Sequence, residues 1–137
     1  MNPAAKKATA ESLEKVRKHL EYSFNKSTKI GLRPDLSEPE LETLESFSSR
    51  FARYSDLIVS RYFRFMMLEK DPGYSGSVID TLNSAEKFGW ITSAEAWRRI
   101  RELRNVAAHE YAEEDHIALY AELLKLTPLL LGVQVTA

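Results

Sequence analysis

A long apolar stripe in the first half of the chain limits the possible folds more than any other feature. Large apolar side chains recur there at steps of three or four residues, the repeat of one helical face. They are Leu41, Leu44, Phe47, Phe51, Tyr54, Ile58, Tyr62 and Phe65. Just before them, residues 37–40 match a capping box, with Ser37 as N-cap and Glu40 at the third helical position. The pattern predicts one helix from there to about Glu69, ~45 Å long, which would form the centre of a bundle.

Shorter segments with the same repeat predict four further helices, and no stretch alternates with the period of a strand. The expected helices cover residues 9–25, 77–88, 93–110 and 113–131. We expect Val78, Leu82 and Ala85 to face the core, and Pro128 to kink or shorten the last helix. Residues 1–8 are expected to be frayed. The prediction is a single domain over residues 1–137, an all-α antiparallel bundle of about five helices with one long central helix.

Composition narrows the functional classes. With 137 residues, 44% of them hydrophobic, the chain can bury a core. It has no cysteine, which excludes disulfides, zinc–thiolate sites and thiol catalysis. The net charge of −1 supplies no overall field that attracts nucleic acid, so an RNA site would have to be a local patch. Residues 1–10 lack the apolar region of a signal peptide, and no apolar run approaches a membrane span. We therefore expect a cytoplasmic protein without membrane contact.

Polar side chains with a chemical use are concentrated near the end of the expected helix 93–110. On a helical projection Arg104 falls inside the apolar face, at about 340° when Trp97 is placed at zero. An arginine there needs an anion, a partner or water, because an unpaired buried charge is very costly. An adjoining sector between about 40° and 120° holds Arg98, Arg101, Asn105 and His109. Guanidinium, amide and imidazole groups on neighbouring sectors suit a site that binds and cleaves phosphodiesters.

The same residues carry a resemblance to a known family. Residues 104–111 read Arg-Asn-Val-Ala-Ala-His-Glu-Tyr. This run resembles the R-N-x-x-x-H-x-Y motif of the HEPN superfamily, and it is most similar to the HepT-like toxins. The resemblance implies a homodimer in which two copies of the motif form one cleft. It also implies a cognate MNT-type nucleotidyltransferase as antitoxin. In some such systems that partner adenylylates the tyrosine, which makes Tyr111 a possible AMPylation site; the alternative is that Tyr111 is a core aromatic that closes the helix end.

The expected chemistry is metal-independent cleavage of RNA by its own 2′-hydroxyl. His109 can move a proton near neutral pH, and Arg104 can hold the phosphate and stabilise developing charge. Asn105, four residues before the histidine, can orient the ring or the substrate. Glu102 can either hydrogen-bond the ring or be a solvated surface residue. The products would be a 2′,3′-cyclic phosphate and a 5′-hydroxyl. Neither a cofactor nor a metal is expected. Arg104 and His109 are about 140° apart on an ideal helix, so one helix presents both to a single phosphate only with help from the arginine's reach. The resemblance implies instead that the two motif copies of a homodimer face each other and form the site between them.

Further arginines are candidates for RNA binding. Arg50, Arg53, Arg61 and Arg64 fall within about 80° of one another on the long helix, beside the apolar stripe. They predict either a solvated flank or an edge that contacts phosphates. The RNA-binding candidates are Arg50, Arg53, Arg98 and Arg101.

The leading hypothesis is therefore the ribonuclease toxin of a type II or type VII-like toxin–antitoxin pair. The alternative is a non-catalytic substrate-binding or regulatory subunit of an MNT-type nucleotidyltransferase. A third interpretation is a plain helical dimer whose motif has lost its function.

Overall fold

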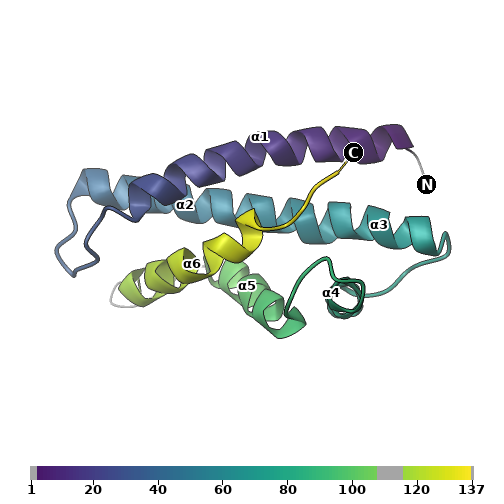
Figure 1. Cartoon of the computed structure of the whole chain (residues 1–137). Helices are drawn as coiled ribbons and strands as arrows, with labels where there is room; N and C mark the ends of the chain where they lie inside the picture. The colour runs from purple at the N-terminus through teal and green to yellow at the C-terminus, as the bar shows by residue number, and fades with distance from the viewer. Residues whose placement is uncertain (1–2, 108–115, 137) are drawn as a thin grey trace.

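The computed structural model describes residues 3–107 and 116–136, and all the regular structure in these residues is helical. Helix α1 (Pro3–Ser27) lies beside the long central helix, which comprises α2 (Glu38–Leu57), a π-helical turn η1 (Ile58–Tyr62) and α3 (Phe63–Lys70). Helices α4 (Val78–Lys87), α5 (Ala94–Ala107) and α6 (His116–Leu131) lie on the other side of the central helix (Figure 1). The prediction of an all-α bundle of five helices, one of them spanning 33 residues, is confirmed.

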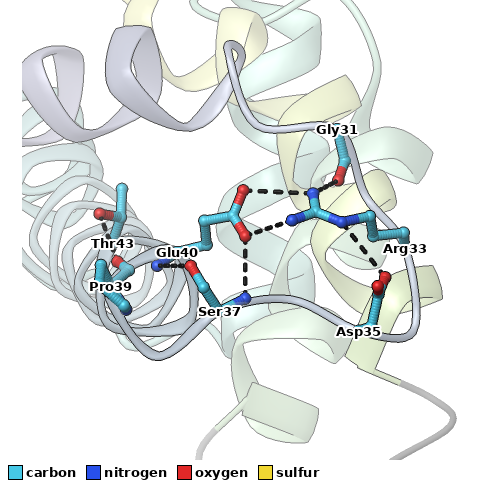
Figure 2. Close-up of polar contacts among 7 residues, drawn as sticks. All are labelled: Gly31, Arg33, Asp35, Ser37, Pro39, Glu40 and Thr43. Atoms are coloured by element: carbon cyan, nitrogen blue, oxygen red, sulfur yellow. Dashed lines mark hydrogen bonds and ion pairs between the residues drawn. The ribbon is translucent and has the colours of Figure 1, made fainter.

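The start of the central helix is fixed by the predicted capping box. The Glu40 amide donates to Ser37 Oγ at 3.3 Å, and the Ser37 amide donates to Glu40 Oε1 at 2.9 Å. Arg33 adds a third contact, since its Nη2 donates to the same carboxylate at 2.6 Å. Figure 2 shows the Arg33 guanidinium between Glu40, the Gly31 carbonyl and Asp35. These contacts, that with Arg33 above all, lower the pKa of Glu40 to about 2.

The central helix changes register at η1, which the sequence did not predict. The Phe63 amide bonds to the Ile58 carbonyl, five residues back, so one extra residue enters this turn. Before the turn, the buried residues follow the predicted stripe; after it, Phe63 and Met67 are buried. Phe65, expected in the core, is only half-buried and lines a hollow against α1. The extra residue shifts the spacing of buried positions by one residue after η1, so α3 is rotated relative to the helix that the sequence predicts.

Aromatic side chains fill the core between the central helix and α5. The ring centroid of Phe63 lies 5.7 Å from that of Trp97 and 5.8 Å from that of Trp90. Trp97 is buried, as are Leu82 and Ala85 of α4. Val78 does not face the core as expected, because it lies in the first turn of α4 and is 37% exposed.

The start of the chain also differs from expectation, whereas the last helix ends at Leu131 as predicted. Residues 3–8 belong to α1 rather than being frayed, and Lys6 Nζ lies 2.6 Å from Glu69 Oε1, which joins the start of α1 to the end of α3. Helix α6 continues past Pro128 to Leu131, with the proline exposed to solvent. Beyond it the Thr136 amide donates to the Tyr62 hydroxyl at 2.8 Å. Among the described helices, none combines the length and the apolar character that crossing a membrane requires.

Candidate functional site

Helix α5 carries Arg104 to the surface of the central helix. Ser93 caps α5 by accepting from the Ala96 amide at 3.1 Å. The buried face of α5, which includes Ile100 and Leu103, packs into the core. Arg104 follows directly after Leu103, so it lies at the edge of this packed face and is partly buried. The expectation that an arginine at this position needs an anion can therefore be examined directly.

The anion is Asp56, on α2. Arg104 Nε donates to Asp56 Oδ1 at 2.9 Å, and Arg104 Nη2 donates to Asp56 Oδ2 at 2.8 Å. Arg101, one helical turn earlier, donates to Oδ1 at 2.8 Å. The hydrogen bonds to Asp56, supported by its charge, raise the pKa of the Arg104 guanidinium above its ordinary value. Two parallel bonds fix the plane of the guanidinium as well as its position. Its Nη1 group makes no hydrogen bond within the described part of the chain, so that edge can still bind a phosphate oxygen.

This pair lies beside a hollow of about 720 Å³ between α1, the central helix and α5. Among the described residues, its lining is dominated by four guanidinium groups and contains a single carboxylate, that of Asp56. The lining residues are Arg53, Arg61, Arg101, Arg104, Asp56, Asn105, Ser12, Val16, Leu57 and Ser60. A surface with this excess of positive charge favours an anionic ligand, although the chain as a whole carries a net charge of −1.

Four of the predicted site residues meet at this hollow: Arg104, Asn105, Arg101 and Arg53. Three others have different surroundings. Arg50 donates to Ser23 Oγ at 2.6 Å and to the His19 carbonyl at 3.1 Å, so it joins α2 to α1.

Arg98 donates to Asn83 Oδ1 on α4 at 3.3 Å. Glu102 accepts from Arg99 at 2.9 Å, in an exposed ion pair that also includes Glu122. Neither Arg98 nor Glu102 lines the hollow, and their expected roles at the site receive no support from this arrangement.

The other half of the motif lies outside the described residues. His109 and Tyr111, predicted as catalytic base and as possible modification site, belong to residues 108–115. Arg104 and Asn105 lie three and two residues before the last described residue of α5, Ala107. The expected pairing of Arg104 with His109 therefore stays a prediction.

Two charged residues of the hollow were not assigned to the site from the sequence. Asp56 had part of a signal, because Arg104 on an apolar face required an anion and Asp56 falls about 60° from Arg53, next to the arginine flank of the central helix. What the sequence lacked was the pairing of positions 48 residues apart. Arg61 was noted only as part of the arginine flank. Its place in the hollow depends on the rotation of the helix at η1, which no residue pattern indicated.

Within residues 3–107 and 116–136, no group of three His, Asp or Glu side chains is arranged to hold a metal ion. No family model matches the chain, and neither a curated protein nor a solved structure matches it. Function must therefore be argued from the residues and the geometry of the hollow.

Proposed function

We propose that this chain is a metal-independent endoribonuclease of the HEPN class, acting as the toxin of a toxin–antitoxin pair. The observation that carries the proposal is the position of Arg104. It lies at the rim of an arginine-rich hollow, its guanidinium oriented by Asp56, five residues before His109 in the chain. The motif that resembles the HepT-like toxins supplies the histidine. Arginine and histidine together are sufficient for RNA cleavage through the 2′-hydroxyl.

In the proposed mechanism, His109 takes the proton from a ribose 2′-hydroxyl while the oxygen attacks the adjacent phosphorus. The free edge of the Arg104 guanidinium binds the phosphate oxygens and stabilises the charge that develops on them. The bond from phosphorus to the 5′-oxygen breaks, and that oxygen takes a proton from water as it leaves, while the protonated His109 returns its proton to solvent. The products are a 2′,3′-cyclic phosphate and a 5′-hydroxyl, and no metal ion takes part. Asn105 lines the same hollow and can position the substrate.

The site is proposed to be completed in a homodimer. Two motif helices that face each other across a two-fold axis would place the histidine of one copy near the arginine of the other. The same interpretation gives the chain a cognate MNT-type nucleotidyltransferase as antitoxin, with Tyr111 as a candidate for adenylylation.

A second candidate function is a binding subunit of such a nucleotidyltransferase without catalytic activity. One observation favours it: both oxygens of Asp56 are bonded by Arg101 and Arg104, the arrangement expected of an ion pair whose role is structural. The two candidates differ in what the chain does when its partner is absent.

The deciding experiment expresses wild type, His109→Ala and His19→Ala without any partner. His19 is an exposed histidine on α1, so it controls for loss of an imidazole elsewhere. A ribonuclease toxin predicts growth arrest and RNA fragments with 2′,3′-cyclic phosphate ends for wild type and His19→Ala, and neither for His109→Ala. Normal growth and intact RNA with folded wild type would favour the binding subunit.

A further inference from the structure

Two arginines of the central helix, Arg53 and Arg61, share the hollow with Arg104. On a regular α-helix, eight residues apart, they would point about 80° apart. The extra residue at η1 reduces the difference to about 20°, which brings both guanidinium groups to the same side. The structure agrees, since both line the hollow. The sequence predicted an edge of four arginines along one helix. The π-turn instead brings two of them, Arg53 and Arg61, to the hollow beside Arg104.

The other two arginines of that edge are engaged elsewhere. Arg50 is bonded to α1. Arg64 donates to the Gly76 carbonyl at 3.4 Å and lies 5.9 Å from the centre of the Tyr74 ring. By contrast, Arg53 and Arg61 form no ion pair or hydrogen bond with the described residues, and both are exposed. Since Asp56 is already bonded by Arg101 and Arg104, the described residues that line the hollow offer Arg53 and Arg61 no further anion.

We propose that Arg53 and Arg61 bind the phosphates of single-stranded RNA next to the one held at Arg104. Guanidinium groups that have no partner among the described residues, and that lie beside a proposed site for a phosphodiester, suit its neighbouring phosphates. None of the described residues that line the hollow is aromatic, so these residues offer no ring on which a base could stack. Binding here therefore depends on the backbone and not on base sequence. The inference rests on the proposed function, because it takes the ligand at Arg104 to be RNA.

The test measures binding without cleavage. The probe is a fluorescent single-stranded RNA of about 12 nucleotides, within the usual range of such sites, with 2′-O-methyl riboses that prevent attack by the 2′-oxygen. Its affinity is measured by anisotropy between about 50 and 200 mM salt. The variant is Arg53→Ala/Arg61→Ala, and the matched control is Arg50→Ala/Arg64→Ala, which removes the same charge from the same helix.

Each phosphate contact on a single strand contributes about 0.7 to the slope of log affinity against log salt concentration. Loss of Arg53 and Arg61 should lower the slope by about 1.4, so wild type should lose about sevenfold more affinity than the variant across this salt range. A second RNA of the same length and different sequence should behave alike. The control should retain the wild-type slope. Circular dichroism confirms that both variants are folded.

Equal slopes for wild type and the Arg53→Ala/Arg61→Ala variant would overturn the inference, whether or not the protein cleaves RNA. An equal loss in the Arg50→Ala/Arg64→Ala control would overturn it too, because the effect would then be one of overall charge. If the probe shows the predicted slopes and unmodified RNA is left intact, the binding surface stands and the nuclease proposal fails. The same proteins therefore distinguish a failure of this binding inference from a failure of the nuclease proposal.

Discussion

Arg104 and Asp56 form a two-pronged ion pair across α5 and α2, with the Nε and Nη2 donors 2.9 and 2.8 Å from the two carboxylate oxygens. This geometry holds the guanidinium plane in one orientation before any substrate is present. A site of this kind depends on the partner that orients the arginine as well as on the arginine itself.

Replacing Asp56 by Asn should therefore affect activity more than stability. The pair is about one third exposed on both sides, so its loss should lower the free energy of unfolding by only about 1 kcal/mol. RNA cleavage should fall further than that, because the amide keeps the shape but no longer accepts from both donors. Urea unfolding and cleavage rates are measured together. Arg101→Ala, which removes only the single bond to Oδ1, should give the smaller loss in both. Full activity in Asp56→Asn would show that Arg104 needs no orienting partner.

Arg104 and His109 should behave as one unit. Each replacement by Ala should reduce cleavage by ~100- to 10,000-fold, and the double replacement should cost little more, because residues that act on the same phosphate are not additive. Arg104→Lys should also lose most activity, since lysine keeps the charge without the planar fork. Rates are compared beside helical content for all four variants. Multiplicative losses would indicate that the two residues act at separate steps.

Cleavage should not require a divalent metal. Proton transfer by His109 and charge stabilisation by Arg104 supply the chemistry that a metal would otherwise provide. The rate in excess EDTA should equal the rate in buffer with magnesium. Activity that disappears in EDTA and returns with magnesium would contradict the proposed mechanism.

The protein should be a dimer in solution. Light scattering at tens of micromolar should give twice the mass of the chain, and mixing Arg104→Ala with His109→Ala should restore part of the activity, because one of the two composite sites would be intact in a mixed dimer. If the protein is a monomer and still cleaves RNA at the normal rate, the proposal of a site shared between two copies is wrong.

Acid should weaken the start of the central helix through Glu40. Its pKa is about 2 in the folded chain and 4.5 ordinarily, so its contribution to stability is fully present above 4.5 and disappears as the pH falls towards 2. Glu40→Gln should therefore be less stable than wild type at neutral pH, with the difference shrinking across that range. Urea unfolding at several pH values provides the measurement. Ser37→Ala should cost about 1 kcal/mol at neutral pH, through loss of the cap. A gap between wild type and Glu40→Gln that stays constant down to pH 2 would argue against this role.

The sequence predicted what depends on near neighbours. The capping box at Ser37 needs only residues three apart, and the stripe from Leu44 to Tyr54 needs only a regular helix. The core position of Phe65 was wrong because the register shift at η1 is set by packing against other helices. Asp56 shows the same limit at the site: the need for an anion was local, and its identity depended on how two helices cross.

The π-turn has a consequence for how the charged surface of this protein can change in evolution. One residue inserted into a helix rotates everything after it by about 100°. Gain or loss of this residue therefore rotates the half of the central helix that holds Arg61 relative to the half that holds Asp56. A relative without this residue would carry a straight helix with its later arginine turned towards α1 or solvent. When homologues of this protein are aligned, a gap of one position within residues 58–62 would indicate that the later arginine faces another side of the central helix. Such a gap would therefore mark a change in the charged surface beside α5.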